Sequence, residues 1–266
     1  MKYSIKQMAL LLGTTTYKLR YYQKLGIIKP IVDENTGYRY YSVLDTRRFN
    51  MACNYSNLGF SLQETLDILS SFDYDYINSN FTKKTEEIKK EIIYKELCLS
   101  YIDETKLELK YMSANINKVI IVHQEEYARL EFSKGEIINS DKKILEKRDE
   151  LMKYSPLVKW VSRISKDSIN DLQDIEYFYG LNIKTKDAKE LGIDIEGFTI
   201  IPDGKYLYTV FKKNTRDDFD KQTLTVIQDY LKENNINNIN DAYSTCIFST
   251  TENEDYVNFH NILLKI

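Results

Sequence analysis

Two arginines and a group of tyrosines near the start of the chain have the chemistry needed to bind phosphate groups. Arg20 and Arg39 carry guanidinium groups, which can donate two parallel hydrogen bonds to one phosphate. Tyr21, Tyr22 and Tyr40 lie close to them in the sequence and present hydroxyl donors on rigid rings. The alternative for the tyrosines is core packing, which we expect for about half of this cluster, and Arg20 can instead brace a neighbouring hairpin through an acidic residue. The side chains that remain exposed would form a surface for a polyanion.

Charge is divided unevenly along the 266 residues. Residues 1–60 hold nine Lys and Arg against three Asp and Glu, a net charge of +6, whereas the rest of the chain carries −9. A basic segment attached to an acidic body indicates that the basic segment meets a polyanion such as nucleic acid.

Helix signals place these side chains on a helix-turn-helix. Ser4 followed by Gln7 is a capping-box start, Gly13 ends the first short helix, and Thr15 can cap a second one that runs to about Lys24. Two short helices joined by a turn with Gly are typical of a helix-turn-helix. The start of the second helix is the part that reaches base edges in such motifs. It carries Thr15, Thr16, Tyr17 and Lys18.

A β-hairpin is predicted directly after the second helix. Residues 31–32 and 38–41 are its two short strands, joined by a turn-rich loop. A hairpin in this position is a wing. Two further helices are expected, over residues 43–57 and from Ser61 to about Ser70, and the first of them carries Arg47 as another phosphate contact.

Four short motifs lie within residues 3–70: Leu19-Arg20-Tyr21-Tyr22, Gly26-Ile27-Ile28-Lys29-Pro30, Gly37-Tyr38-Arg39-Tyr40-Tyr41-Ser42 and Leu58-Gly59-Phe60-Ser61-Leu62. Together and in this order they resemble the MerR-type transcriptional regulators. The resemblance implies a winged helix-turn-helix, an antiparallel dimerising helix, and binding to promoter DNA whose spacer is too long for RNA polymerase. It also implies activation by bending and untwisting that DNA when a signal arrives. One departure lies late in the third helix, where the family often has basic residues and this chain has Asn54, Ser56 and Asn57.

A long polar helix is predicted over residues 75–118, because this stretch has neither Pro nor Gly and is dominated by Glu and Lys. Its apolar residues recur at steps of seven, or of four and three, with interruptions at Lys95 and Lys106. So narrow an apolar stripe needs a partner helix, either in a dimeric coiled coil or across the chain's own C-terminal domain. The stripe consists of Phe81, Ile88, Ile92, Leu99, Ile102 and Leu109.

The expected fold class is α+β, in three parts: a winged helix-turn-helix over 1–73, a coiled-coil dimerisation helix over 74–118, and an α+β domain over 119–266. In the last part, the alternating strand-like segments and the helices between them predict one strand–helix–strand–strand unit that occurs twice. Strands are predicted at 119–122, 127–132, 160–164, 175–183, 206–211, 243–249 and 256–266, helices at 140–154 and Phe219–Asn234, and a connection at 192–204.

Three segments of this last part, Ile201–Tyr206, Glu233–Asn235 and Asn261–Ile266, resemble the GyrI-like effector-binding domain of multidrug-sensing MerR proteins. The resemblance implies a small, often aromatic or cationic, molecule held between the two halves. It also places Ser244 where such relatives have a carboxylate, so neutral and cationic ligands both remain open.

Aromatic rings in the predicted strands are the candidate ligand contacts, since they offer stacking and cation–π interactions. The side-chain period of a strand puts Tyr177, Tyr179, Leu181 and Ile183 on one face and Glu176 on the other. The alternative for each ring is an ordinary core. The predicted pocket residues are Trp160, Tyr177, Tyr179, Tyr208, Tyr243 and Ser244.

Catalysis and metal sensing are not expected. His123 and His260 stand apart from each other and from any Cys, and no phosphate loop, nucleophile elbow or metalloprotease motif occurs. The three cysteines lie far apart, which indicates reduced thiols, and no cofactor is predicted. Neither a long apolar run nor a signal peptide is present, so we expect a cytoplasmic protein.

The sequence therefore predicts a homodimeric DNA-binding transcriptional regulator that responds to a small hydrophobic or aromatic effector. It would act as an activator, together with RNA polymerase at a promoter. The alternative is a repressor or architectural dimer whose C-terminal domain binds no small molecule. An aromatic-lined pocket in that domain favours the first hypothesis, and a collapsed core favours the second.

Overall fold

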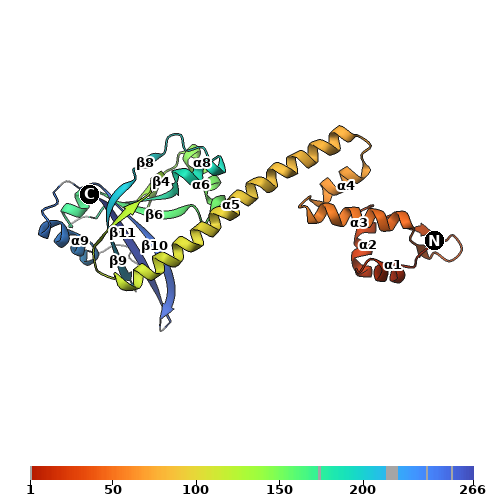
Figure 1. Cartoon of the computed structure of the whole chain (residues 1–266), viewed down its shortest axis with the longest axis horizontal. Helices are drawn as coiled ribbons and strands as arrows, with labels where there is room; N and C mark the ends of the chain where they lie inside the picture. The colour runs from red at the N-terminus through yellow and green to blue at the C-terminus, as the bar shows by residue number, and fades with distance from the viewer. Residues whose placement is uncertain (1, 173–174, 214–220, 238, 253) are drawn as a thin grey trace. The chain divides into compact units, whose positions relative to one another are not determined.

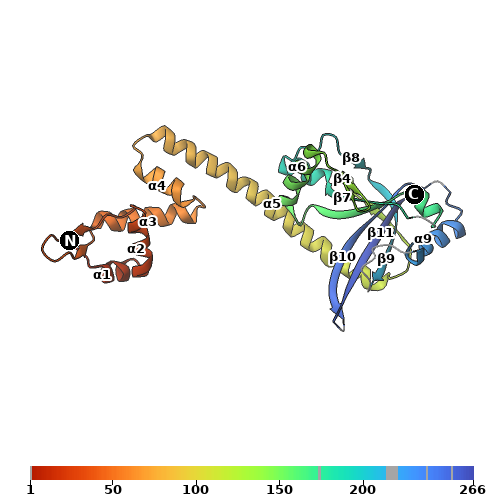
Figure 2. The ribbon, with the colours of Figure 1, turned by 180° about the vertical axis from the view of Figure 1, so that it is seen from behind.

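The computed structural model describes residues 2–172, 175–213, 221–237, 239–252 and 254–266. The chain divides into two compact units, the first ending at Lys89 and the second beginning at Lys90. Their elements are labelled in Figure 1 and seen from behind in Figure 2. Within the described ranges, no helix is both long enough and apolar enough to span a bilayer.

The N-terminal unit contains the predicted pair of helices, hairpin and two further helices. Ser4, Ser42 and Ser61 each begin a helix with a capping box, in which the serine side chain accepts a hydrogen bond from the backbone three residues on. The hairpin pairs Ile31 with Tyr40 and Val32 with Arg39. The elements are α1 (Ile5–Leu11), α2 (Thr16–Lys24), β1 (Ile31–Val32), β2 (Arg39–Tyr40), α3 (Val43–Asn57) and α4 (Leu62–Ser70).

A small apolar core fixes α1, α2 and α3 against one another. Its fully buried members include Met8 from α1, Leu19 from α2 and Ala52 from α3. Ile27 and Ile28, just after α2, lie in the same cluster with no exposed surface. Because this core holds α2 from one side, the opposite side of α2 is left exposed.

The long helix is α5 (Tyr74–Ala114), which spans 41 residues. It ends four residues before the predicted Lys118, in a turn where Asn117 adopts a left-handed conformation with φ of 56°. Phe81, which was predicted to belong to the seam, packs on Tyr55 and Phe60 with ring centroids 5.6 and 5.1 Å away. Along the whole of α5 no side chain is fully buried.

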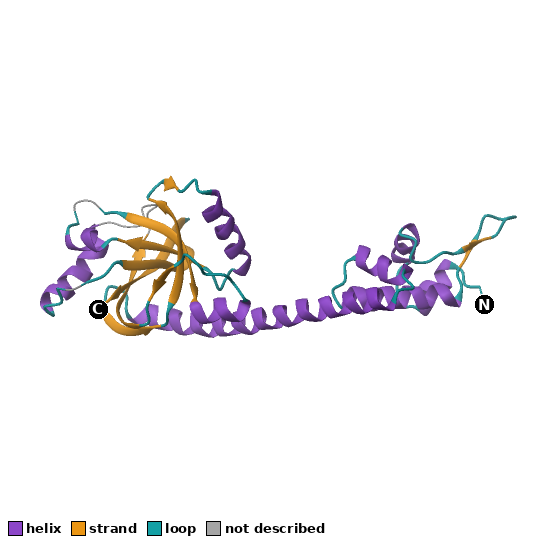
Figure 3. Cartoon of the chain, turned by 90° about the horizontal axis from the view of Figure 1, so that it is seen from above, coloured by secondary structure: helices purple, strands orange, loops and turns teal. Residues whose placement is uncertain are grey.

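The C-terminal unit repeats one strand–helix–strand–strand unit, as predicted. The central strands of the two repeats, β6 and β10, pair antiparallel and join them into one sheet with the order β3-β9-β11-β10-β6-β7-β4-β5. Figure 3 shows the strands gathered in this sheet with helices around it. The first repeat is β4 (Tyr127–Lys134), α6 (Lys142–Leu151), β6 (Lys159–Ile164) and β7 (Tyr177–Lys184), and the second is β9 (Gly204–Lys213), α9 (Lys221–Glu233), β10 (Ala242–Glu252) and β11 (Asp255–Lys265).

Several short elements were not predicted, because two or three residues, or a single helical turn, carry too little periodicity. The predicted connection 192–204 contains β8, which pairs with β4. The first two residues of the predicted helix Phe219–Asn234 lie outside the described residues. The additional elements are β5 (Ile137–Ile138), α7 (Lys166–Asn170), α8 (Thr185–Leu191) and β8 (Thr199–Ile201). Two other short elements fall within predicted ones: β3 (Ile120–Gln124) overlaps the predicted strand 119–122, and η1 (Met152–Tyr154) lies at the end of the predicted helix 140–154.

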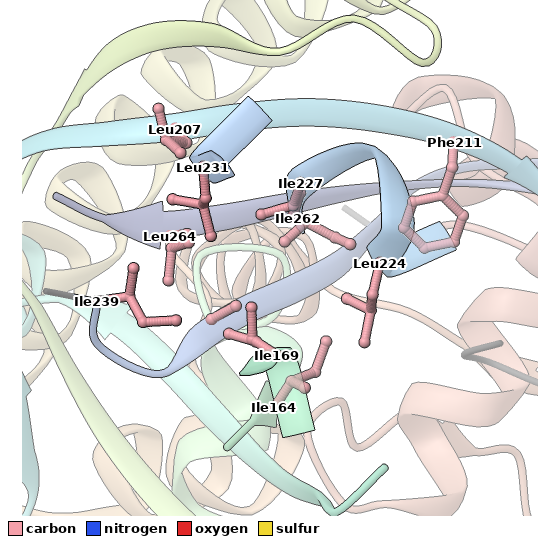
Figure 4. Close-up of a cluster of buried hydrophobic side chains, with 11 residues drawn as sticks. Ile164, Ile169, Leu207, Phe211, Leu224, Ile227, Leu231, Ile239, Ile262 and Leu264 are labelled. Atoms are coloured by element: carbon pink, nitrogen blue, oxygen red, sulfur yellow. The ribbon is translucent and has the colours of Figure 1, made fainter. Parts of the chain in front are cut away.

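One face of the sheet is covered by helices and carries the apolar core of this unit. Figure 4 shows Ile227 and Leu231 of α9 beside Ile262 and Leu207 of the sheet, and Leu224 of the same helix belongs to the same cluster. A second cluster, under α6 and α8, contains Leu130, Leu181, Ile183, Leu151 and Ala188. The side chains that alternate with these along the strands lie on the other face, where the end of α5 contacts the sheet.

Candidate nucleic-acid interface and ligand pocket

The first turns of α2 present polar and aromatic side chains to solvent. Thr15 caps the helix, its Oγ1 accepting a hydrogen bond of 3.1 Å from the backbone N–H of Lys18. Tyr17 is 80% exposed and Tyr21 is 45% exposed, and their spacing of four places them on the same side of the helix. Lys18 is exposed and Thr16 is partly buried. This end of α2 can therefore contact a ligand without unfolding.

The wing presents a second exposed cation. Asp33 shapes its turn by accepting hydrogen bonds from the backbone N–H groups of Asn35 and Thr36 and from the Thr36 hydroxyl, and these bonds lower the pKa of Asp33. Arg39 follows the turn and is exposed, whereas Tyr40 beside it is partly buried. The turn thus holds the strand that carries Arg39.

Arg20 and Arg39 lie close to one buried tyrosine, although they come from α2 and from the wing. Burial raises the pKa of Tyr41, and the positive charges of Arg39 and Arg20 oppose that shift. No ion pair within the described ranges includes either arginine. The predicted brace between Arg20 and an acidic residue is therefore not found there, and both charges face solvent.

Two charged side chains of this unit are structural. Arg48 donates hydrogen bonds to the backbone carbonyls of Ile27 and Leu69, at 2.7 and 3.3 Å. Asp45, which is 5% exposed, accepts from the backbone N–H groups of Lys29 and Ser42, both at 2.8 Å. Of the adjacent arginines Arg47 and Arg48 on α3, only Arg47 is exposed to solvent.

Tyr22 was predicted as a phosphate contact, and the structure places its ring in the core instead. It is 6% exposed and packs on Phe49 with ring centroids 5.2 Å apart. On a helix whose opposite side faces solvent, the neighbours Tyr21 and Tyr22 must point in different directions, about 100° apart. Of the two, Tyr21 is the one available to a ligand.

A pocket of about 390 Å³ lies between the last turns of α5 and the open face of the C-terminal sheet. Glu104, Leu107, Glu108 and Tyr111 form its helical wall, at the spacing of one helix face. This part of α5 therefore packs across its own domain, but none of these four residues belongs to the predicted apolar stripe. Ile92, Leu99 and Ile102 remain 51%, 64% and 52% exposed.

Three of the six predicted pocket residues line this pocket: Tyr208, Tyr243 and Ser244. The other three, Trp160, Tyr177 and Tyr179, do not. In register, Trp160 stands beside Leu181 and is 51% exposed, with its ring 5.3 Å from that of Phe132. The rings of Tyr177 and Tyr179 pack on each other at 5.4 Å.

The alternation of side chains explains this division. Tyr177 and Tyr179 share a face with Leu181 and Ile183, as predicted, but that face is the core beneath α6 and α8. Ser244 pairs with Ile262, a core residue, so its side chain also points away from Tyr243. The sequence pattern identified which residues share a face, and the packing of the helices decided which face borders the pocket.

An ion-pair cluster around one buried lysine ties α5 to the sheet. Lys184, at the end of β7, is 8% exposed, and its Nζ lies 2.5 Å from Glu104 Oε1 and 2.6 Å from Glu125 Oε2. Burial lowers the pKa of Lys184, but the hydrogen bonds to Glu104 and Glu125 outweigh burial and raise its pKa above the usual value. The three residues lie far apart in the sequence, so no local motif could have revealed them.

The pocket is also lined by tyrosines that stay neutral over a wide pH range. Burial raises the pKa of Tyr206 to about 12, and its hydroxyl donates to the carbonyl of Pro202 at 2.6 Å. Burial, followed by the negative charge of Glu108, raises the pKa of Tyr208. Tyr208 is 6% exposed, and its hydroxyl has no hydrogen-bond partner among the described residues. A buried hydroxyl without a partner is costly, so it favours a ligand that supplies one.

Next to the pocket, the same sheet face carries a buried arginine. Arg129 is 1% exposed and donates to Asn182 Oδ1 and to the backbone carbonyls of Val161 and Phe178, at 3.0, 3.1 and 2.8 Å. A Cβ atom at Gly180 would lie 2.8 Å from its guanidinium carbon, so glycine leaves the room that this side chain needs. Asn182, which lines the pocket, is thereby held in one orientation.

The N-terminal unit is by its architecture a winged helix-turn-helix domain with exposed cations on its second helix and wing. Residues 3–71 match the family described as MerR HTH family regulatory protein. This segment is therefore similar to the helix-turn-helix segment of that family.

Two relatives each match part of the chain. A probable heavy metal-dependent transcriptional regulator of Haemophilus influenzae is 37% identical over 70 residues, which are 26% of this chain and 55% of that protein. The HTH-type transcriptional activator mta of Bacillus subtilis is 29% identical over 96 residues, 36% of this chain and 35% of that protein. The matches thus span about half or less of these relatives' length. A MerR-family transcriptional regulator from Bacillus cereus, solved by crystallography, is 25% identical over 41% of this chain and 84% of its own, with a TM-score of 0.37.

Among the described residues, no group of three or more His, Cys, Asp and Glu side chains has the arrangement of a metal site. Cys53 and Cys98 are free thiols, each partly buried.

Proposed function

We propose that this protein is a ligand-responsive transcriptional regulator that binds promoter DNA as a homodimer. The observation that supports this most directly concerns α5. This one helix follows the DNA-binding domain in the chain, and its last turns form a wall of the C-terminal pocket. A molecule that contacts Glu108 or Tyr111 thus contacts the element that leads directly to the DNA-binding domain.

DNA binding would use the exposed side chains of α2 and the wing. Thr15, Thr16, Tyr17 and Lys18 stand at the start of α2, the position from which recognition helices reach base edges in the major groove. Arg20, Arg39 and Arg47 are exposed cations that would contact phosphates, with the hydroxyls of Tyr21 and Tyr40 as further donors.

Dimerisation would use the exposed stripe on α5. Ile88 is 37% exposed, and Ile92, Leu99 and Ile102 are more than half exposed, at the heptad-like spacing of a coiled coil. An apolar stripe of this kind on a charged helix is stabilised when a second helix covers it. In an antiparallel arrangement, two copies would each present one DNA-binding domain to a half-site.

We assign the protein the role of an activator. One relative, 29% identical over 96 residues, is described as a transcriptional activator. In this proposal the dimer occupies a promoter whose spacer is too long for RNA polymerase, and the effector favours a dimer arrangement that bends and untwists the DNA. A ligand shifts such an equilibrium only through different affinities for the two arrangements. The effector should therefore alter DNA distortion strongly and operator affinity little.

The test is transcription in vitro from the protein's own promoter, with the spacer shortened by single base pairs. We expect the full-length spacer to need both protein and effector, and a spacer of optimal length to give high transcription without either. The highest output from the full-length promoter without protein, together with release of DNA by the ligand, would instead identify a repressor.

A further inference from the structure

Two charged groups in the pocket lining remain outside its ion-pair cluster. Of the acidic and basic side chains that line the pocket, Lys184 pairs with Glu104 and Glu125. Within the ranges that the structure describes, Glu108 has no cation within 4.0 Å and Lys159 has no carboxylate within 4.0 Å. The pocket therefore presents one carboxylate and one ammonium group that are paired neither with each other nor with a neighbour.

Glu108 is held in a fixed position by the sheet. The side-chain amide of Asn261, on β11, donates to Glu108 Oε1 at 2.9 Å, and its Oδ1 accepts from the backbone N–H of Thr245 at 3.0 Å. Asn261 is 3% exposed, so this orientation is determined by the fold. A carboxylate with one amide donor retains acceptor capacity for a charged donor from a ligand.

Lys159 is the first residue of β6 and lies on the same sheet face as Val161 and Asn182. Its Nζ lies 5.3 Å from the ring centroid of Tyr101, on α5, which orients the side chain without neutralising its charge. Both Lys159 and Glu108 also border an adjoining cavity of about 290 Å³. They are therefore neighbours around one stretch of α5, and a single small molecule can reach both.

The hydroxyl of Tyr208 completes the polar set. It is buried on the pocket face without a partner in the described part of the chain, and it can donate one hydrogen bond. Around these groups the pocket is lined by apolar and aromatic side chains, including Leu107, Tyr111 and Leu263. The volume of about 390 Å³ lies within the range of about 300–1,000 Å³ that is usual for small-molecule sites.

We propose that the pocket takes a small zwitterion, with a protonated amine facing Glu108 and a carboxylate facing Lys159. Amino-acid-like and short peptide-like compounds with an apolar side chain have this chemistry. The inference rests on the proposed function, because it assigns the chemical class of the effector. A ligand with only a positive charge would neutralise Glu108 and cover Lys159 without a counter-charge, and a ligand with only a negative charge would do the reverse. Covering an unpaired charge is costly in either case.

The experiment is isothermal titration calorimetry of the full chain with three matched dipeptides. The probes are leucyl-phenylalanine, its C-terminal amide, which has only the positive charge, and its N-acetyl derivative, which has only the negative charge. We expect the zwitterion to bind about tenfold more tightly than either blocked form, which corresponds to about 1.4 kcal/mol.

Two variants assign each end of the ligand. Glu108→Gln should abolish the preference for the free amine over the acetylated form, and Lys159→Met should abolish the preference for the acid over the amide. Glu146→Gln and Lys143→Met, on the solvent-exposed surface of α6, are matched controls that should leave all three affinities unchanged. Circular dichroism of each variant shows that it is folded.

Equal binding of the zwitterion and its amide would overturn the inference in favour of a cation site, and no binding of any probe would overturn it as well. Neither result bears on the proposed function, because promoter activation and its spacer dependence are measured separately. An aromatic ammonium ion without a carboxylate, benzyltrimethylammonium, is included as a fourth probe. If it alone binds, the pocket remains an effector site and the zwitterion is the wrong class.

Discussion

The two candidate binding surfaces of this protein differ in how their charged side chains are arranged. In the N-terminal unit, Lys18, Arg20 and Arg39 are exposed on α2 and the wing, and the described residues supply them with no ion-pair partner. In the C-terminal pocket, acidic and basic groups share one lining, and Lys184 is almost fully buried between two carboxylates. The first arrangement attracts any polyanion over a distance, and the second selects a small molecule by the positions of its charges and donors.

This difference separates structural charges from binding charges. The structural charges have specific partners: Arg48 is bonded to two backbone carbonyls, and the buried Lys184 to Glu104 and Glu125. Lys18, Arg20, Arg39, Glu108 and Lys159 have no ion-pair partner among the described residues, and they lie at the two surfaces that we assign to DNA and to the effector. If the assignment is right, changes at one surface should leave binding at the other intact.

The largest effect is expected from breaking the dimer. The double substitution Ile92→Asp and Leu99→Asp places charges in the exposed stripe of α5 and should produce monomers. Operator affinity should then fall by about 100-fold or more, because two linked DNA-binding domains gain affinity from each other. Analytical ultracentrifugation and gel-shift titration measure both quantities.

The pocket should still bind its ligand in that variant, since neither residue lines the pocket. The double substitution Lys83→Asp and Glu91→Asp, at exposed positions of the same helix, is the control and should remain dimeric. A wild-type protein that is already monomeric at micromolar concentration would contradict the dimer.

Removing Arg20 or Arg39 should reduce affinity for specific and random DNA alike. Arg20→Ala and Arg39→Ala should each cost about five- to tenfold and lower the slope of log affinity against log salt by roughly 1. Fluorescence anisotropy at several salt concentrations measures this, and ligand binding should not change.

Arg48→Ala, in the same unit, shows the effect of losing a structural arginine instead of a DNA-contacting one. Because its guanidinium group bonds Ile27 and Leu69, its loss should lower the melting temperature and leave the salt slope unchanged. Unaltered DNA binding by folded Arg20→Ala and Arg39→Ala would show that those two arginines do not contact DNA.

Removing the hydroxyl of Tyr208 should increase the stability of the ligand-free protein and weaken binding of the effector. Tyr208→Phe eliminates a buried donor that has no partner in the described structure, so it should raise the free energy of unfolding without ligand by about 1 kcal/mol. The same change should weaken binding of the effector by about fivefold and leave operator affinity unchanged. Tyr256→Phe, at a residue that is 74% exposed, is the control. Lower stability of Tyr208→Phe would show that the hydroxyl already has a partner.

The smallest effect concerns alkaline pH. The pKa of Tyr206 is raised from 10.0 to about 12 in the folded protein, so the unfolded chain loses this proton first. The contribution of Tyr206 to stability is therefore complete below pH 10.0 and is lost as the pH rises toward about 12. Urea unfolding at about pH 9 and about pH 11 should show a smaller decline in Tyr206→Phe than in the wild type. An identical decline would place the ionising groups elsewhere.

The helix starts, the turn and the wing of the N-terminal unit could be predicted from the sequence. The capping serines Ser4, Ser42 and Ser61, the turn glycine Gly37 and the short wing strands all depend on neighbours within a few residues. The repeat of strand, helix, strand and strand in the C-terminal unit was likewise predicted, because periodicity over ten residues distinguishes helices from strands.

The roles of single side chains could not be predicted from the sequence in the same way. Tyr21 and Tyr22 are adjacent and chemically identical, and only the position of Phe49 in the folded core makes Tyr22 a packing residue. Arg47 and Arg48 are a similar pair, in which the carbonyls of Ile27 and Leu69 select Arg48 for a structural role.

The sequence by itself determined which residues share a helix side or a strand face, since that follows from the 3.6-residue and 2-residue periods of the backbone. Tertiary structure alone decided which face of the sheet became the core and which became the pocket. Tyr177 and Tyr179 lie on the face that α6 and α8 cover, whereas Tyr208 lies on the face that the end of α5 approaches. It also brought Glu108, Lys159 and Asn261 together from α5, β6 and β11, because contacts between distant segments depend on how whole elements pack.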